Sequence, residues 1–231
     1  MKLGIFGGTF NPIHFGHLRV AEEVREAAGL DRIIFIPSGT PPLKTENIAA
    51  ARQRLAMTQL AIKKNPCFEM LDIECRRRQK SYTTKTLERL RELYPDDRLF
   101  FMLGIDAFLD IPNWHRPDVL VRQTDFLVLS RPGFRFIDLS SSPYLSIPRP
   151  LLRKLDARTL RYHTALLAGG RTATLLPVSP VAISATDIRS RAAQRKSIKY
   201  LLPAGVESYI ISENLYVSAK KRHRTIERGC R

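Results

Sequence analysis

The segment LGIFGGTFNPIHFGH, residues 3–17, decides how this chain is expected to fold. An apolar run stops at Gly7-Gly8, and a segment with helical apolar periodicity follows from Phe15 to Ala28, directly before Gly29. This order indicates a strand, a glycine turn and a helix, with Gly29 at a position where helices commonly end. The next run, Arg32 to Ile36, is apolar on successive residues, as in a parallel strand buried on both faces. Two strands around one helix form a βαβ unit.

The same alternation of helices and strands continues along the chain. It predicts helices near Ala50–Lys63 and Thr83–Leu93, and strands near Phe68–Ile73, Arg98–Leu103, Asp125–Leu129 and Thr172–Pro177. The pattern is typical of an α/β fold with a doubly wound, mostly parallel sheet and helices on both faces. Ligands of such sheets bind beyond the carboxyl ends of the strands, so the residues that follow each strand are the candidates for a site.

Three segments interrupt this pattern. Residues 38–47, SGTPPLKTEN, have the proline and glycine content of a loop, and we expect this loop to contact a substrate. Residues 133–150 are rich in Ser, Pro and Arg without periodicity, which predicts an insertion. Residues 218–231 carry six Lys or Arg and one acidic residue, which indicates a flexible basic tail. We therefore expect one domain over residues 1–217, followed by the tail.

Composition excludes several classes of protein. With 231 residues, 44% of them hydrophobic, the chain can bury a core, but it has no apolar run of membrane-spanning length and no signal peptide pattern. We expect a cytoplasmic protein without a membrane partner. Cys67, Cys75 and Cys230 show neither a C-x-x-C pair nor a metal-ligand spacing, so we expect reduced thiols and no protein-bound metal. The formal net charge of +16 attracts polyanions, which include nucleic acids, anionic membranes and nucleotides.

The glycine turn and the helix after it favour phosphate binding. Gly7 and Gly8 allow the backbone to approach a ligand closely, and the helix that starts near Phe15 points free N–H groups and its positive dipole end at that ligand. His14 and His17 are three residues apart, so both imidazoles can reach one bound group if the helix begins between them. Each ring would then offer an N–H donor to a phosphoryl oxygen.

A second candidate phosphate site lies in PVSPVAISATDIRSR, residues 177–191. Ser184 and Thr186 stand where a helix begins, and Arg189 follows one turn later with a planar, permanently charged guanidinium. Taken alone, this segment is better explained by an ordinary N-cap with a solvated arginine.

The string GGTFNPIHFGH resembles the nucleotidyltransferase superfamily, whose HxGH motif binds the triphosphate of ATP, and ISATDIR resembles the ISxTxIR signature that the superfamily also uses on ATP phosphates. The resemblance implies a Rossmann-like nucleotidyltransferase fold, with His14, His17, Lys44 and Arg189 as catalytic residues. It implies ATP contacts from Gly7, Gly8, Thr9, Phe10, His17, Gly104, Asp106, Ile183, Ser184, Thr186 and Arg189. Asp106 would contact the adenosine ribose.

Further motifs resemble the nicotinate-nucleotide adenylyltransferases. SYTTKTL at residues 81–87 is similar to their SYTxxTL, and Gly104-Ile105-Asp106 with Trp114 is similar to their GxDxxxxxxxW. PPLK at residues 41–44 is similar to their PPHK-like loop, with Leu43 where histidine is frequent, and Asn11 stands where many relatives have aspartate. The resemblance extends from residue 4 to Tyr216. It implies nicotinate mononucleotide contacts from Lys44, Tyr82, Thr83, Thr86, Trp114, His115 and Arg131.

In that family the tryptophan stacks on the pyridine ring, and backbone amides near the Thr86 and His115 positions receive the nicotinate carboxylate. The resemblance implies transfer of the adenylyl group of ATP to the 5′-phosphate of nicotinate mononucleotide, which gives deamido-NAD and pyrophosphate in NAD biosynthesis. Mg²⁺ would be carried by ATP through water and phosphate oxygens. The sequence leaves open whether the protein is a monomer or a homo-oligomer.

Two other functions compete with this one. Adenylyltransferases of the same fold act on nicotinamide mononucleotide or phosphopantetheine. An RNA-binding module is the competitor from another class, because HxGH also resembles the HIGH motif of class I aminoacyl-tRNA synthetases and the tail is basic. However, no KMSKS-like lysine loop is present, and no aromatic residues are interleaved with the basic runs, as stacking on single strands requires. We therefore expect no stable nucleic-acid partner.

Overall fold

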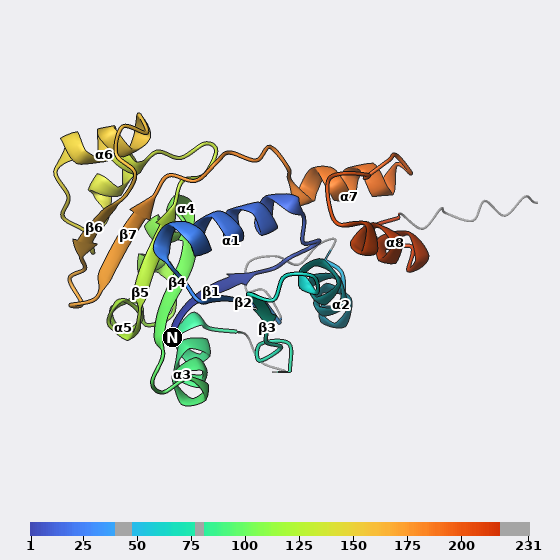
Figure 1. Ribbon diagram of the computed structural model, residues 1–231, viewed down its shortest axis with the longest axis horizontal. Helices are drawn as coiled ribbons and strands as arrows, with labels where there is room; N and C mark the ends of the chain where they lie inside the picture. Colours follow the sequence, from blue (N-terminus) through green and yellow to red (C-terminus); the bar gives the residue numbers. More distant parts are fainter. Residues whose placement is uncertain (40–47, 77–80, 218–231) are drawn as a thin grey trace, which may run out of the picture.

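We analysed a computed structural model of the chain, which describes residues 1–39, 48–76 and 81–217. Its centre is a seven-stranded sheet in the order β3-β2-β1-β4-β5-β7-β6 (Figure 1). The strands are β1 (Lys2–Gly8), β2 (Arg32–Pro37), β3 (Phe68–Met70), β4 (Arg98–Gly104), β5 (Asp125–Leu129), β6 (His163–Leu166) and β7 (Thr172–Leu176). The α-helices are α1 (Phe15–Ala28), α2 (Ala51–Ile62), α3 (Thr83–Leu93), α4 (Ile105–Leu109), α5 (Pro117–Gln123), α6 (Arg149–Asp156), α7 (Ala185–Ala193) and α8 (Ala204–Ser212). Two 3₁₀ helices, η1 (Ile111–Asn113) and η2 (Phe136–Ser141), complete the described elements.

The predicted doubly wound, mostly parallel sheet is confirmed. All strand pairs are parallel except the pair of β6 with β7. The chain builds the sheet outward from β1 through β2 to β3, and then in the other direction from β4 through β5 to β7. The switch in direction falls between β1 and β4, and a crevice for ligands is expected beyond the carboxyl ends of these two strands.

Helices cover both faces of the sheet. Neighbouring residues of a strand point to opposite faces, so a strand of successive apolar residues needs a covering layer on each side. In β2, Ile34 and Ile36 pack into a core with residues of α3, α4, α5 and α6. Ile33 and Phe35 of the same strand pack into a second core with residues of α1, α2, α7 and α8. The successive apolar residues of the strand therefore fill two cores, as its continuous hydrophobic sequence predicts.

Most predicted elements are found within one or two residues of their expected bounds. The strand expected over Phe68–Ile73 is shorter and ends at Met70. Leu71 still donates its N–H to the Phe35 carbonyl at 3.0 Å, but a turn begins after it and takes the chain out of the sheet.

The segment from residue 133 onward holds more structure than its irregular sequence predicts. Residues 133–150 contain η2 and the first residues of α6, and the short antiparallel strand β6 follows. α6 was missed because prolines and serines surround it. The division into one domain over residues 1–217 and a tail stays a prediction, since residues 218–231 lie outside the described residues.

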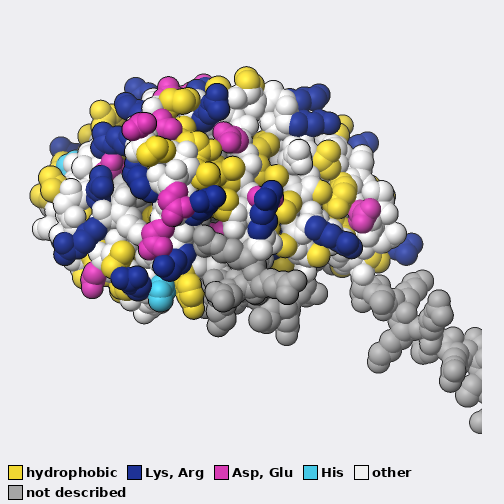
Figure 2. Space-filling view, turned by 90° about the horizontal axis from the view of Figure 1, so that it is seen from below, with side chains coloured by type: hydrophobic (Ala, Val, Ile, Leu, Met, Phe, Trp, Pro, Cys, Tyr) yellow, Lys and Arg dark blue, Asp and Glu magenta, His cyan; other side chains and the backbone are white. Residues whose placement is uncertain are grey.

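Basic and acidic side chains are mixed on the face drawn in Figure 2. Within the described ranges, no helix combines the length and the apolar character needed to cross a membrane.

Candidate active site

The first helix entrance carries the two histidines of HxGH. α1 begins at Phe15, between them, with His14 as the N-cap residue. The backbone N–H of His14 donates to Nδ1 of His17 at 3.2 Å, and the two ring centroids are 3.8 Å apart. Because Nδ1 of His17 accepts this hydrogen bond, we assign the proton of the neutral ring to Nε2. His17 thus presents an N–H donor at its outer nitrogen.

Both imidazoles are neutral at physiological pH. Burial lowers the pKa of His14 to about 4. Burial, and then the nearby His14 and Arg131, hold the pKa of His17 well below its ordinary value. Neutral rings act as hydrogen-bond donors to phosphoryl oxygens without first losing or gaining a proton.

Gly16 lets the histidine pair sit directly against the helix. A Cβ atom at this position would lie 2.9 Å from Nδ1 and 3.0 Å from Cε1 of His14. The same atom would lie 3.6 Å from the carbonyl oxygen of Ile183, which belongs to the segment before α7. The glycine of HxGH therefore makes room for the His14 ring at the point where the two helix entrances meet.

The second helix entrance lies beside the first, and Figure 1 shows the start of α7 next to the start of α1. Ser184 is the N-cap of α7, and its hydroxyl accepts the N–H groups of Thr186 and Asp187 at 3.2 and 3.5 Å. Arg189 is not solvated as in an ordinary helix start. One of its terminal nitrogens donates to the Asn11 carbonyl at 2.8 Å, across 178 residues of sequence. The structure thus brings HxGH and ISxTxIR together.

These entrances open into a cleft of about 1220 Å³ at the carboxyl ends of β1 and β4. Most of the residues expected to bind ATP line it, and so do the expected catalytic residue His14 and two of the residues expected to bind nicotinate mononucleotide. They are Gly7, Gly8, Thr9, Phe10, His14, His17, Gly104, Trp114, Arg131, Ile183, Ser184, Thr186 and Arg189. This cleft is the candidate active site for two reasons. It lies at the switch point of the sheet, and the side chains listed above converge on it.

Asp106 lies beside the cleft, where β4 passes into α4. One of its carboxylate oxygens pairs with Arg131 at 2.9 Å. Its other oxygen, Oδ1, is buried and has no hydrogen-bond partner in the described part of the chain. A Cβ atom at Gly104 would come within 2.5 Å of that oxygen, so only glycine leaves it in place. A buried acceptor without a partner is suited to a ligand hydroxyl.

Trp114 forms part of the wall of the cleft on the side of β4. Its Nε1–H donates to Oδ2 of Asp110 at 2.9 Å, and its ring meets Phe101 edge to face at 6.5 Å. The carboxylate of Asp110 also accepts an N–H of Asn113. The indole is therefore held in one orientation before any ligand binds.

Four described residues expected to bind nicotinate mononucleotide do not line the cleft, namely Tyr82, Thr83, Thr86 and His115. Tyr82 stacks on His115 with centroids 4.2 Å apart, which joins the start of α3 to the residue after Trp114. Thr83 is the first residue of α3, and the Thr86 amide donates to the Tyr82 carbonyl at 3.1 Å within the helix. Lys44 and the PPLK segment lie outside the described residues. The binding roles of all these residues stay predictions.

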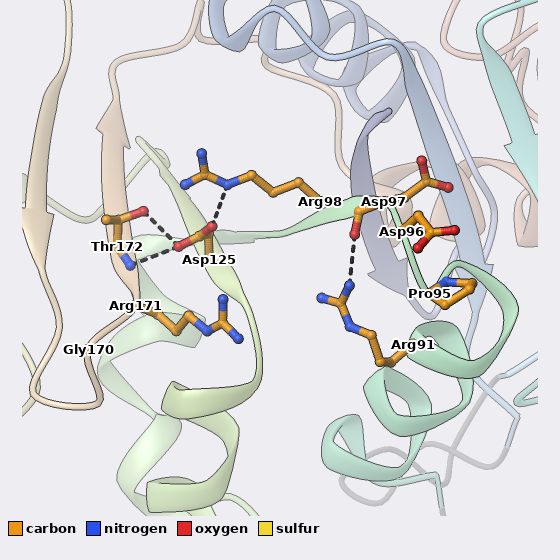
Figure 3. A pocket seen from close by; sticks show the side chains of 9 residues that line it. All are labelled: Arg91, Pro95, Asp96, Asp97, Arg98, Asp125, Gly170, Arg171 and Thr172. Carbon is orange, nitrogen blue, oxygen red and sulfur yellow. Dashed lines mark hydrogen bonds and ion pairs between the residues drawn. The ribbon is translucent and has the colours of Figure 1, made fainter.

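A second pocket, of about 390 Å³, lies at the opposite end of the sheet, where β4, β5 and β7 begin (Figure 3). Its arginines are already engaged. Asp125 accepts Nε of Arg98 at 2.8 Å and both the amide and the hydroxyl of Thr172, and Arg171 donates to the Arg122 carbonyl. Although burial disfavours the charged carboxylate, these hydrogen bonds lower the pKa of Asp125. Because hydrogen bonds within the protein already engage Arg98, Asp125 and Arg171, we place the chemistry in the larger cleft.

Several residues that shape the site were not singled out in the sequence. Asp110 holds Trp114, Tyr216 donates its hydroxyl to Oδ1 of Asn11 at 2.8 Å, and the buried Arg54 contacts the glycine turn. For Arg54 a signal was present, because it lies on the same face of its helix as Met57 and Thr58. For Tyr216 and Asp110, no local sequence pattern indicates that they hold Asn11 and Trp114.

Comparison with known proteins agrees with this geometry. The cytidylyltransferase-like family model matches residues 5–191, which places the chain among nucleotidyltransferases. Two curated relatives are each described as a probable nicotinate-nucleotide adenylyltransferase. The one from Syntrophotalea carbinolica is 43% identical, over 96% of this chain and 100% of its own length. The one from Trichlorobacter lovleyi is 40% identical, over 94% of this chain and 99% of its own length. The chain belongs to the family of nicotinate-nucleotide adenylyltransferases.

A solved structure has the same fold at low sequence identity. It is the nicotinic acid mononucleotide adenylyltransferase of Plasmodium falciparum, complexed with NaAD. It superimposes with a TM-score of 0.68, is 21% identical, and the match covers 93% of this chain and 97% of the other. The Rossmann-like nucleotidyltransferase fold is thereby confirmed.

Proposed function

We propose that this chain transfers the adenylyl group of ATP to the 5′-phosphate of nicotinate mononucleotide, giving deamido-NAD and pyrophosphate, a step of NAD biosynthesis. The observation that carries the proposal is the meeting of two helix entrances, with the His14–His17 pair and Arg189, at one cleft. Helix N-termini attract phosphates, and one triphosphate is long enough to contact both.

The attacking group needs no general base. A phosphate monoester has its second pKa near ~6, so its oxygens are largely ionised at neutral pH. One of these oxygens forms a bond to the α-phosphorus of ATP, the bond from that phosphorus to the bridging oxygen breaks, and pyrophosphate leaves with the electron pair. The enzyme then has to align the reactants and stabilise the charge that develops on the phosphoryl oxygens.

The cleft supplies groups suited to that task. Nε2–H of His17 is a neutral, fixed donor, because burial keeps the pKa of the ring low and Nδ1 is occupied by the His14 amide. Arg189 adds a permanent positive charge that remains held by the Asn11 carbonyl. We assign the α-phosphate and the departing pyrophosphate to these two side chains. Oδ1 of Asp106, which has no hydrogen-bond partner among the described residues, fits a ribose hydroxyl of adenosine.

We propose that Mg²⁺ enters with ATP. In the ranges that the structure describes, no group of three or more His, Cys, Asp or Glu side chains is placed to hold a metal ion. This fits a cation that is bound by triphosphate oxygens and water, where it offsets phosphate charge.

The substrate side of the proposal is tested with a panel of phosphate acceptors and a Trp114 variant. Pyrophosphate release from ATP should be faster with nicotinate mononucleotide than with nicotinamide mononucleotide or phosphopantetheine. Trp114→Ala should raise the KM for the pyridine mononucleotide and leave the KM for ATP unchanged, since the indole is assigned to the pyridine ring alone. Trp114→Phe, which keeps an aromatic face, is the matched control and should show a smaller effect.

A preference for another acceptor would overturn the proposed substrate. An equal rise of both KM values in Trp114→Ala would show instead that the indole only supports the fold.

A further inference from the structure

Arg54 is a charged residue buried where its helix packs against the site. It lies in the first turn and a half of α2 and is only 1% exposed, so its guanidinium cannot be hydrated by bulk water. A buried guanidinium requires hydrogen bonds from the protein to offset the loss of hydration. Burial lowers the pKa of Arg54 from its ordinary value, but an arginine starts so high that it stays protonated.

The hydrogen bonds of Arg54 go to the backbone of three separate segments. Nε donates to the Ala49 carbonyl at 3.0 Å, one terminal nitrogen donates to the Thr9 carbonyl at 2.8 Å, and the other donates to the Gly39 carbonyl at 2.7 Å. Thr9 follows β1, Gly39 follows β2, and Ala49 precedes α2. Each nitrogen of one planar group therefore holds a different part of the chain.

Two of these segments form the wall of the candidate active site. Thr9 lines the cleft, and so does Ile48, the neighbour of Ala49. The Ala49 amide also donates to Oδ1 of Asn11 at 3.0 Å, and the Asn11 carbonyl accepts Arg189. Arg54 is thus linked through Ala49, by two hydrogen bonds, to Asn11, the residue that holds Arg189.

Gly39, whose carbonyl accepts the third hydrogen bond of Arg54, is packed closely against the Glu74 carbonyl. A Cβ atom at this position would lie 2.3 Å from the Glu74 carbonyl oxygen, so the backbone there is pressed against the chain after β3. The carbonyl that Arg54 binds therefore belongs to a closely packed residue, against which the other two contacts are held.

We propose that Arg54 is a positioning residue of the active site, which fixes the glycine turn at Thr9 and the segment at Ala49 against Gly39 through one planar guanidinium. It touches neither substrate and acts through the backbone it holds. The inference rests on the proposed function, because the wall it fixes is the one assigned to ATP. A lysine cannot replace it, since an ammonium does not present three nitrogens in one plane at these separations.

The test compares Arg54→Lys and Arg54→Met with Met57→Ala. Met57 lies in the same helix, is fully buried in the apolar core, and does not line the cleft, so its truncation destabilises the fold without touching the site. Thermal unfolding gives the midpoint of each variant, and kcat and both KM values are then measured well below the lowest midpoint. Wild-type protein is assayed in parallel with ATP and nicotinate mononucleotide.

Arg54→Lys should lower kcat by about tenfold and Arg54→Met by about a hundredfold, because small displacements of catalytic groups have effects of this size. Both Arg54 variants should change kcat more than they change either KM. Met57→Ala should keep kcat within about twofold of wild type even where its midpoint falls as far as that of Arg54→Met.

Three results would overturn the inference. One is near-normal kcat in Arg54→Lys, and another is an equal loss in Met57→Ala at a matched midpoint. The third is failure of Arg54→Lys to fold, which would assign the guanidinium to the fold and not to the reaction. Inactive wild-type protein would instead refute the proposed function, so the two failures are distinguishable.

Discussion

His17 is the side chain whose chemistry is most fully set by its surroundings. The His14 amide fixes which ring nitrogen carries the proton, and burial keeps the ring neutral. A preorganised donor of this kind is worth far more in a cleft than in water, because it does not have to reorient as charge develops.

Replacement of His17 by alanine tests this role. His17→Ala should lower kcat by about a hundredfold to a thousandfold, as loss of one preorganised donor commonly does, while the protein stays folded. Steady-state kinetics and circular dichroism measure the two effects. His163→Ala, in the edge strand β6 and away from the cleft, is the matched control. Near-normal turnover of His17→Ala would remove the residue from the catalytic role.

At the scale of residues, sequence predicts side chains that act through their own chemistry better than those that act through the backbone. His14, His17 and Arg189 were singled out because HxGH and ISxTxIR resemble two signatures of one superfamily. Arg54 escaped notice because its partners are the carbonyls of Thr9, Gly39 and Ala49, which every residue possesses. Only the folded backbone brings those three oxygens within reach of one guanidinium.

At the scale of elements, the position of the His14 ring at the start of α1, beside the segment before α7, depends on a glycine. A Cβ atom at Gly16 would press on the His14 ring at 2.9 Å and approach the Ile183 carbonyl at 3.6 Å. The contact with the Ile183 carbonyl would be an ordinary van der Waals contact, so it is the place of the His14 ring between the two helix entrances that requires glycine here.

Gly16→Ala should therefore lower kcat/KM by about tenfold to a hundredfold, because the His14 ring must move while α1 remains a helix. Gly205→Ala is the matched control. It lies in α8, where a Cβ atom would meet nothing closer than 3.8 Å, and it should stabilise the protein by about 0.5 kcal/mol without changing kcat/KM. Kinetics and denaturant unfolding of both variants check this. Unchanged kinetics in Gly16→Ala would contradict the close-contact account.

Elements with a clear periodicity of apolar residues were predictable from the sequence, and irregular elements were not. α1 and α3 were predicted with the bounds they have, because each has a clear apolar face and a defined start. α6 and β6 were missed, since β6 has only four residues with half of them exposed, and its pairing with β7 comes from the tertiary fold. The carboxyl-end rule for parallel sheets predicts a cleft beyond the ends of β1 and β4, and the structure has a cleft at that place.

At the scale of the whole molecule, the buried histidines make stability depend on pH. Burial lowers the pKa of His14 to about 4, whereas in the unfolded chain it lies near its ordinary value of 6.5. Between these values the unfolded state binds a proton that the folded state excludes. The free energy of unfolding is therefore unaffected by His14 well above pH ~6.5 and falls as the pH drops toward ~4.

The His14→Gln variant, which cannot take up this proton, should lose less stability on acidification. Between about pH 7 and about pH 5, the wild-type protein should lose on the order of 2 kcal/mol more than the variant. Denaturant unfolding at both pH values provides the measurement. The Asp125 carboxylate, whose pKa is lowered, contributes only at more acidic pH and does not mask the effect. Equal losses in the two proteins would show that His14 is protonated in the fold.

The proposed function requires that two distant parts of the chain bind one triphosphate. The most direct measurement is a crystal structure with an ATP analogue whose α,β-bridging oxygen is replaced by methylene, so that the reacting bond cannot break. We predict that Nε2 of His17 and the guanidinium of Arg189 lie within hydrogen-bond distance of oxygens on the same triphosphate. A triphosphate bound by only one of these side chains, or bound outside the cleft, would contradict it.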